Sequence, residues 1–338
     1  MDHSEISHRL ISRRAMIRRF VLAPATLALA AQVAGQERPP RRLTFGLISD
    51  IHPDVMPDGT KRVQAFVAAM KEARADFILQ LGDFCWPHPR NQAFLDAWNA
   101  FGGPSYHVLG NHDMDGGYQR QQTASFYGMP GPHYAFQAGP VRGLVLDGNE
   151  PGGKAAGYKR FIGPAQAAWL EREMEQAAGP VLLFIHQPFD SDGNDCLENA
   201  AAIRALVERA QAAHPGRIVA VFSGHRHLDF QQVVNGVRHI QVNSAAYWWL
   251  DNPAAYRQTY PPEVHQKYPY LDHVAAYRDP LWALVTLDFA KGELVIQGRR
   301  SEWVGPDPWQ RGQAEDSAQS LHPRLHPWIS DRQEKIAI

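Results

Sequence analysis

The sequence predicts an α/β fold in which helices pack on layered β-sheets. From residue 43 onward strand-like and helix-like segments alternate, several strand-like segments are apolar throughout, and segments such as 61–75 repeat apolar residues with helical spacing. Strands that are apolar on both faces are typical of sheets covered on both sides. Strands are expected at 43–49, 77–81, 106–109, 141–146, 181–185 and 218–222, and helices at 61–75, 91–101, 164–177 and about 200–213.

The second half of the chain adds two predicted hairpins and an aromatic region. Asn235-Gly236, between β-rich runs at 231–234 and 237–242, is a strong turn signal. A closing hairpin is expected over 281–298, which would complete a main domain at 43–300. Residues 246–280 combine Tyr and Trp with prolines, and we expect an ordered aromatic insertion near the functional site.

Two further regions lack a clear periodic pattern. Residues 116–139 are rich in Gly, Tyr, Gln and Pro, so we expect a long loop or a small hairpin there. Residues 301–338 hold Pro, Trp and charge without apolar periodicity. We expect them to be a C-terminal tail that wraps the surface or is disordered.

The N-terminus has the features of an export signal. A basic segment with the pair Arg13-Arg14 precedes an apolar run at 20–34, which is shorter than the ~20 residues of a membrane helix. Residues 1–35 therefore resemble a twin-arginine signal, with acceptable cleavage sites at 28–30 and 33–35, and 36–42 would be a linker. The alternative is a basic amphipathic helix that stays in place. The signal implies the twin-arginine export machinery as a partner, no stable membrane span, and a periplasmic or secreted bacterial protein.

The charge balance argues against a nucleic-acid-binding protein. The 338-residue chain is 44% hydrophobic, enough for a large core, and its formal net charge is -1. Without residues 1–35 it would carry 29 basic and 33 acidic residues. This balance gives no reason to expect binding to a nucleic-acid duplex or to anionic lipid. Attraction for a phosphate would have to come from local charge, which bound metal would supply.

Side chains that can bind metals follow five of the predicted strands. Such strand ends meet at one edge of a sheet, so the side chains should converge. They would form a two-metal hydrolytic site. The segments are Asp50-Ile51-His52, Gly82-Asp83, Gly110-Asn111-His112-Asp113, His186 and Gly224-His225-Arg226-His227.

A site of this kind fits the hydrolysis of a phosphate ester. Two ions ~3.5–4 Å apart lower the pKa of a bound water towards ~7 and neutralise the oxygens of the transferring phosphoryl group. Ions this close need a bridging carboxylate, because a neutral ligand would leave their repulsion unscreened. Asp83 is the expected bridge, since Gly82 before it lets the turn approach the metals.

These segments, in this order, resemble the calcineurin-like metallophosphoesterase family. The family pattern is Asp-x-His, Gly-Asp, Gly-Asn-His-(Asp/Glu), His and Gly-His-x-His, which this chain matches across residues 50–227. The resemblance implies a four-layer αββα sandwich of two mixed β-sheets flanked by helices. It also implies a metal-dependent hydrolase of phosphate esters that uses a metal-bridging hydroxide. The substrate would be a phosphodiester or phosphomonoester of a small molecule or nucleotide.

The resemblance also implies roles for individual residues. It implies two divalent or trivalent metal ions, with Fe, Mn or Zn expected from nitrogen and oxygen ligands. His112 would contact the phosphate and protonate the leaving oxygen, and Asp113 would orient it. Asp50, His52 and His227 would hold one metal, Asp83 would bridge, and Asn111, His186 and His225 would hold the other.

Two positions depart from the pattern or vary within it. Trp86 stands three residues after the expected bridge, where a tyrosinate–iron enzyme of this family has Tyr, so that version is disfavoured. Arg226 occupies the variable position of Gly-His-x-His. Its guanidinium could bind a phosphate oxygen of the substrate, point into solvent or pair with Asp229.

Several alternatives stay open. A catalytically idle metal- or ligand-binding protein on the same fold would predict loss of a metal ligand or of His112, and none is lost. A nuclease would favour a basic surface. The aromatic residues of the insertion could pack in the interior or form a wall for a nucleoside or aryl group. Cys85 and Cys196 could form a disulfide, or Cys85 could be a buried thiol.

Overall fold

The fold is described here from a computed structural model of the chain. The structure describes residues 41–250, 260–310 and 325–337. The expected export signal at 1–35 and linker residues 36–40 lie outside the described residues, as do parts of the aromatic insertion and the C-terminal tail. No described helix is both long and apolar enough to cross a membrane.

The first large sheet has six strands in the order β14-β13-β12-β1-β2-β3. One half of the sheet is parallel, because β1 pairs with β2 and β2 with β3 in the same direction, whereas β12 at the centre runs antiparallel to β1. The sheet is therefore mixed. Its strands are β1 (Arg42–Ile48), β2 (Phe77–Gln80), β3 (Ser105–His107), β12 (Ala283–Asp288), β13 (Glu293–Gly298) and β14 (Arg332–Lys335).

The second large sheet also has six strands, in the order β4-β5-β6-β7-β9-β8. Its inner strands β5, β6, β7 and β9 are parallel, and each edge is closed by an antiparallel strand. Strands β6 and β7 are buried at every position, as their apolar sequences predict. The strands are β4 (Tyr134–Ala138), β5 (Val141–Val145), β6 (Val181–Ile185), β7 (Ile218–Ser223), β8 (Phe230–Val234) and β9 (Val237–Gln241).

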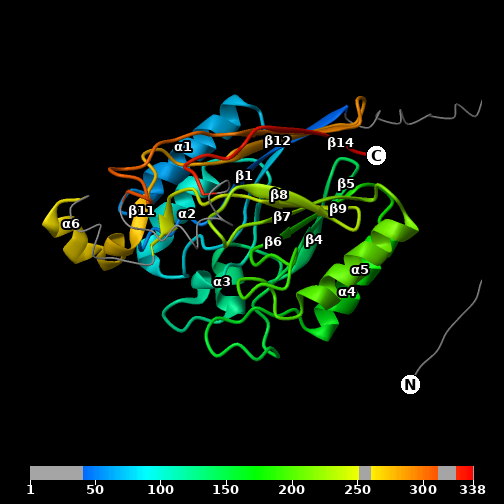
Figure 1. Cartoon of the computed structure of the whole chain (residues 1–338), viewed down its shortest axis with the longest axis horizontal. Helices are drawn as coiled ribbons and strands as arrows, with labels where there is room; N and C mark the ends of the chain where they lie inside the picture. The colour runs from blue at the N-terminus through cyan, green and yellow to red at the C-terminus, as the bar shows by residue number, and fades with distance from the viewer. Residues whose placement is uncertain (1–40, 251–259, 311–324, 338) are drawn as a thin grey trace, which may run out of the picture. The chain divides into compact units, whose positions relative to one another are not determined.

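Helices cover the outer faces of both sheets, which gives the expected four-layer arrangement (Figure 1). Helices α1 (Gly59–Glu72) and α2 (Gln92–Asn99) pack on the first sheet through Phe66 and Trp98. Helices α4 (Pro164–Gln176) and α5 (Ala200–Ala213) pack on the second through Leu170 and Val207. A third apolar core lies between the sheets and includes the stacked rings of Phe45 and Phe77.

Two regions differ from the sequence expectations, and a third, the aromatic insertion, is ordered in its described part, as expected. Residues 116–139 contain a helix, α3 (Arg120–Phe126), which a capping box between Gln119 and Gln122 stabilises, and then strand β4. The expected surface tail returns to the fold as β14, which pairs with β13. The aromatic insertion contains the two-stranded sheet of β10 (Tyr247–Trp249) and β11 (Val274–Ala276), and α6 (Pro262–Lys267).

Candidate metal centre

The structure brings the predicted ligands together at one edge of the two sheets. Parallel strands deliver the loops that follow them to the same side, so five separate segments meet there. The first sheet contributes side chains after β1, β2 and β3, and the second contributes them after β6 and β7. The residues are Asp50, His52, Asp83, Asn111, His186, His225 and His227, and all but the half-buried His225 are buried.

Asp50, His52 and His227 form the first group that could hold a metal ion. One ligand atom from each lies within 4.8 Å of the others. Asp50 Oδ1 is 3.2 Å from His227 Nε2. His52 Nε2 is buried without a hydrogen-bond partner among the described residues, as expected of an atom placed to bind a metal.

Asp83, His186 and His225 form the second group. Their ligand atoms also lie within 4.8 Å of one another. Nδ1 of His225 is 3.2 Å from Nε2 of His186. Asp83 Oδ2 is 3.1 Å from His186 Nε2 in this group and 3.4 Å from His52 Nε2 in the first. One carboxylate oxygen therefore lies between the two groups, which is the position that a bridging ligand requires.

The backbone at these positions is strained. Asp50, His52, Asp83, His225 and His227 all have positive φ, between 49° and 73°. Such angles are uncommon for residues other than glycine and cost of order 1–3 kcal/mol each. Clustering of this strain on the candidate ligands indicates that the fold holds them in position for a function.

Gly82 and Gly110 allow the loops to approach closely. A Cβ on Gly82, whose φ is 100°, would lie 2.5 Å from Nδ1 of His186. A Cβ on Gly110 would collide with the backbone nitrogen and Oδ1 of Asp83. Side chains at these two positions would therefore push apart the loops that carry the candidate ligands.

Two histidines are oriented by backbone carbonyl groups. His186 Nδ1 is 2.8 Å from the carbonyl oxygen of Leu81, and His227 Nδ1 is 2.8 Å from that of Tyr247. A proton on Nδ1 leaves the lone pair on Nε2, which is the atom that faces the carboxylates. This is the ring orientation that metal-binding histidines have in proteins.

The charges of the site depend strongly on one another. Burial acts to raise the pKa of Asp50, yet His227 and His186 outweigh it and lower that pKa to about 2. Burial likewise opposes ionisation of Asp83, but His186 and His112 hold its pKa well below the usual range. Burial lowers the pKa of His225 to about 3. The carboxylates are therefore anionic and His225 neutral at pH 7. Burial lowers the pKa of His186, but Asp83 and Asp50 outweigh it and raise the value to about 9, so a metal bound at this residue would displace its proton.

Asn111 carries a buried amide oxygen that could bind a metal. The residue is buried, and its Oδ1 has no hydrogen-bond partner among the described residues. An unsatisfied amide oxygen in this position fits a hard metal ligand. Nitrogen and oxygen donors, anionic carboxylates and unpartnered buried atoms together fit two metal ions better than any set of internal hydrogen bonds.

His112 lies beside Asp83, the predicted bridge, but is oriented by a different residue from the one predicted. Its backbone N–H donates to Asp83 Oδ1 at 2.8 Å. Its ring Nδ1 is 2.8 Å from Asp115 Oδ2 and 3.1 Å from the hydroxyl of Tyr158, which donates to Asp115 Oδ1 at 2.8 Å. Burial lowers the pKa of His112, but Asp83 and Asp115 outweigh it and raise the value to about 9.

The prediction that Asp113 orients His112 is therefore wrong. Asp113 is fully buried, and its carboxylate accepts hydrogen bonds from the backbone N–H of Phe84 at 2.7 Å and of Gly110 at 2.8 Å. The side chain points into the interior and ties the loop of Asp83 to the loop of Asn111. Asp115 lies beside the ring instead, because the short 3-10 helix His112–Met114 turns the chain so that the residue three positions after His112 comes back towards it.

Arg226 does not face a substrate either. Its Nη1 donates to both oxygens of Asp190 at 3.0 Å, its Nε donates to Asp195, and its side chain is 9% exposed. The possible role of Arg226 as a substrate ligand is therefore wrong, as is a pairing with Asp229. Two carboxylates from the loop after β6 hold the guanidinium, and Asp229 pairs instead with Arg332 at 2.6 Å.

Both cysteines are free, buried thiols. Burial raises the pKa of Cys85 well above its usual value. Cys196 accepts a hydrogen bond from Nη2 of Arg226 at 2.8 Å. The structure thus assigns Cys85 to the core next to the bridge and contains no disulfide between the two.

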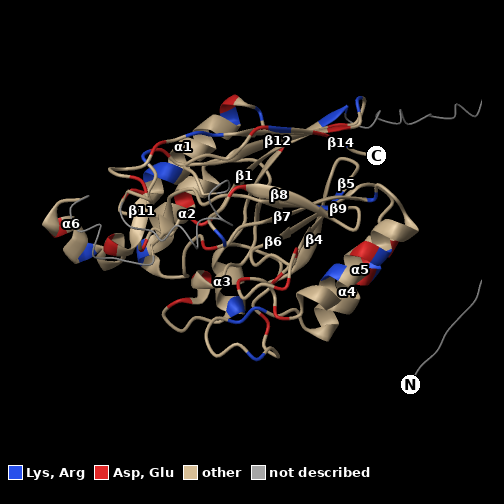
Figure 2. Ribbon diagram, viewed as in Figure 1, with Lys and Arg blue, Asp and Glu red and all other residues tan. Residues whose placement is uncertain are grey.

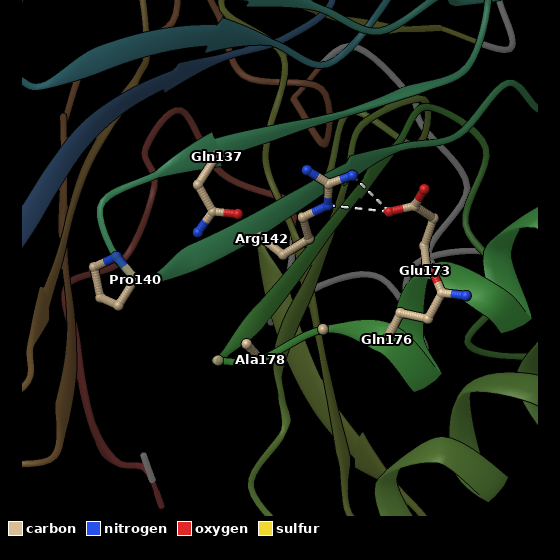
Figure 3. A pocket seen from close by; sticks show the side chains of 8 residues that line it. Gln137, Pro140, Arg142, Glu173, Gln176 and Ala178 are labelled. Atoms are coloured by element: carbon tan, nitrogen blue, oxygen red, sulfur yellow. Dashed lines mark hydrogen bonds and ion pairs between the residues drawn. The ribbon is translucent and has the colours of Figure 1, made fainter.

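A pocket of about 520 Å³ opens beside the two candidate metal-binding groups. His52 and His112 line it together with aromatic side chains, so part of the aromatic insertion does form a wall of the site. The aromatic residues of this wall are Trp86, Tyr158, Trp249 and Tyr270. A second hollow of about 510 Å³ lies along the β4–β5 hairpin (Figure 3), where Arg142 donates to Glu173 Oε2 at 2.7 and 3.0 Å. None of the candidate ligands lines that hollow.

Comparison with known proteins shows the family. Residues 43–229 match the calcineurin-like phosphoesterase family, and the chain belongs to it. A protein of Synechococcus sp. named as a probable cyclic nucleotide phosphodiesterase is 27% identical over 207 residues, which cover 56% of this chain and 75% of that protein.

Solved structures share the fold at low sequence identity. A dimetal phosphatase from Danio rerio superimposes with a TM-score of 0.53 and 16% identity, over 76% of this chain and 96% of that one. GAP50, the anchor in the inner membrane complex of Plasmodium, superimposes with a TM-score of 0.53 and 14% identity, over 88% and 90% of the two chains. At these identities the likeness establishes the architecture of two mixed sheets flanked by helices.

Proposed function

We propose that this protein is a dinuclear metallophosphoesterase that hydrolyses phosphate esters of small molecules or nucleotides. The observation that carries the proposal is the position of Asp83 Oδ2, which lies 3.4 Å from His52 Nε2 and 3.1 Å from His186 Nε2. A single oxygen between two complete ligand groups fits a pair of metals that share a bridge. Membership of the phosphoesterase family supports the reaction class.

Two bound metal ions would supply an activated water and positive charge for the phosphoryl oxygens. Asp50, His52 and His227 would hold one ion, and Asn111, His186 and His225 the other, with Asp83 shared. His112 faces the same pocket and holds a proton that it donates to the leaving oxygen. Asp115 accepts from Nδ1 of His112, which keeps the proton donor, Nε2, directed to the pocket.

The candidate ligands limit the choice of metal ions but do not select a single metal. Imidazole nitrogens and carboxylate oxygens suit Fe, Mn and Zn. The thiol of Cys85 stays protonated because burial raises its pKa, and it is absent from both ligand groups. We therefore propose a pair drawn from these three metals.

A catalytically idle binding protein is the alternative. A structural neighbour, GAP50, is described as an anchor, so the architecture also occurs in a protein with a structural role. In this chain six of the seven expected ligands lie in the two candidate groups, and His112 is held by Asp115 and Tyr158. A side chain kept in position for proton transfer favours the enzyme. A nuclease is disfavoured because Lys and Arg are interspersed with Asp and Glu over the described elements (Figure 2).

The test compares two chromogenic esters on one protein. The chain without residues 1–35 is stripped with chelator, reloaded with Mn, Fe or Zn, and assayed with p-nitrophenyl phosphate and bis-p-nitrophenyl phosphate. We expect metal-dependent release of nitrophenol that chelator abolishes, and the similarity to a named phosphodiesterase favours the diester. Two bound metals with no turnover of either ester would support the idle protein.

Export to the periplasm is a separate proposal. It rests on Arg13-Arg14 and the short apolar run that follows. Fusion of residues 1–35 to a reporter tests it in bacteria with and without the twin-arginine machinery. Replacement of Arg13-Arg14 by lysines should retain the reporter in the cytoplasm.

A further inference from the structure

Two pockets adjoin the metal groups, and one side chain lines both. The first is the pocket of about 520 Å³ beside His52 and His112, which we name the aromatic pocket. The second, of about 390 Å³, lies beside Asn111, and we name it the basic pocket. Tyr158 belongs to the lining of each. A phosphate bound at the two candidate metal-binding groups would therefore lie next to both pockets, with Tyr158 between them.

Tyr158 is fixed in place although 47% of it is exposed. Its hydroxyl donates to Asp115 Oδ1 at 2.8 Å and lies 3.1 Å from His112 Nδ1. Its ring centroid is 4.6 Å from that of His112. These contacts make Tyr158 a stable partition between the pockets.

The two pockets differ in charge. The aromatic pocket combines the rings of Trp86, Trp249 and Tyr270 with the carboxylates of Asp54 and Asp115, and none of its lining residues is Lys or Arg. This lining suits a planar group without negative charge.

The basic pocket has the opposite character. Arg120 and Lys159 line it with the amides of Gln119, Gln121 and Asn149, and none of its lining residues is Asp or Glu. Arg120 pairs with the buried Asp147 and lies 3.9 Å from Glu150, so its charge is neutralised. The amino group of Lys159 donates to the carbonyl oxygen of Ala155 at 3.0 Å. It forms no ion pair with a described residue, so it is accessible to an anionic group of a ligand.

We propose that the substrate is an open phosphodiester with two separate arms, which deepens and rests on the proposed phosphoesterase activity. A planar arm occupies the aromatic pocket, and a polar arm with an anionic group occupies the basic pocket. His112 lines the aromatic pocket, so the planar arm is the one that leaves. Water adds its oxygen to phosphorus, the bond from phosphorus to the planar arm's oxygen breaks, and that oxygen takes the proton of His112. His112 regains a proton from the water, and the products are an alcohol and a phosphate monoester of the polar arm.

The test varies only the retained arm. Thymidine 5′-(p-nitrophenyl phosphate) and its 3′-phosphorylated form share the same leaving group and differ by one anionic group. We expect the 3′-phosphorylated diester to have the higher kcat/KM, by about five-fold, the effect of one exposed ion pair. Lys159→Ala should abolish the difference between the two diesters, and Lys154→Ala, an exposed lysine of the same loop that lines neither pocket, should leave it unchanged.

A binding measurement separates this inference from the proposed function. Calorimetric titration of the metal-loaded chain with thymidine 5′-phosphate and thymidine 3′,5′-bisphosphate should show tighter binding of the bisphosphate, and Lys159→Ala should remove the gain. If no ester is turned over but this gain is present, the proposed function fails and the basic pocket stands. Equal kinetics for the two diesters together with equal binding of the two nucleotides overturns the inference, and so does preferential turnover of a 3′,5′-cyclic nucleotide.

Discussion

The two large sheets contribute different chemistry to the metal centre. The first sheet supplies Asp50 and Asp83, both carboxylates, together with His52 and Asn111, whereas the second supplies the histidines His186, His225 and His227. Each candidate metal group draws ligands from both sheets. Both carboxylates thus come from the first sheet and three of the four histidines from the second, so the site forms only where the two sheets meet. The following predictions test this division.

Removal of the shared carboxylate should have the largest effect. Asp83→Asn takes away the charge that lies between the groups, and we expect kcat to fall by about 10³-fold or more, with loss of both metals. His227→Ala removes one imidazole from the first group only and should leave about one metal bound per chain. Measurement of the bound metal per chain together with kcat distinguishes the two variants. Equal metal loss in both variants would contradict the division of roles between the sheets.

Metal binding should hold the sheets together. Because each group takes ligands from both sheets, the folded state binds metal and the unfolded chain does not bind it well. At a metal concentration about 1,000 times Kd this would contribute about 4 kcal/mol to the free energy of unfolding. Chelator should therefore lower Tm by roughly 10 °C. The matched control is Asp83→Asn, in which chelator should change Tm little, and an unchanged wild-type Tm would argue against ligands from both sheets.

Asp113 and Asp115 should separate into structural and functional roles. Asp113 accepts two buried backbone N–H groups, so Asp113→Asn should lower the free energy of unfolding by about 1–3 kcal/mol. Asp115 contacts His112 and Tyr158 near the surface, so Asp115→Asn should lower kcat by about 10-fold to 100-fold on esters with poor leaving groups. Urea denaturation and a leaving-group series measure these effects. If Asp115→Asn affects all leaving groups equally, Asp115 does not act through the proton of His112.

The last prediction concerns acid stability away from the metals. Burial lowers the pKa of His107 from 6.5 to about 3. As pH falls from 6.5 towards 3, the unfolded chain takes up a proton that the folded protein does not, so the free energy of unfolding falls by about 1.4 kcal/mol per pH unit. In metal-free protein, His107→Gln should remove this part of the pH dependence. Identical slopes of stability against pH in the two proteins would contradict a neutral buried His107.

The sequence was sufficient to predict the architecture and the segments that carry the ligands. Apolar strands such as Val181–Ile185 and Ile218–Ser223 are buried at every position, as their sequences predict. The ends of parallel strands meet at one edge by geometry alone, so polar residues there converge without further information.

Side-chain direction was harder to predict. Asp113 stands next to His112 in sequence, but the 3-10 turn directs it inward and leaves Asp115 beside the ring. The three-residue spacing between His112 and Asp115 could have indicated their contact, because side chains three residues apart lie on the same side of a 3-10 turn. Tyr158 carried no such signal, because its contact with His112 spans 46 residues. Arg226 is held by Asp190 and Asp195 from another loop, and no local pattern indicates that pairing.

The most direct test of the account is the number of metal ions bound per chain. The folded protein is equilibrated with Mn, Fe or Zn, freed of excess metal and measured by elemental analysis, and anomalous scattering from crystals then locates the ions. The account predicts two ions, one among Asp50, His52 and His227 and one among Asn111, His186 and His225, with Asp83 between them. A folded chain that binds no metal under these conditions would contradict the central claim.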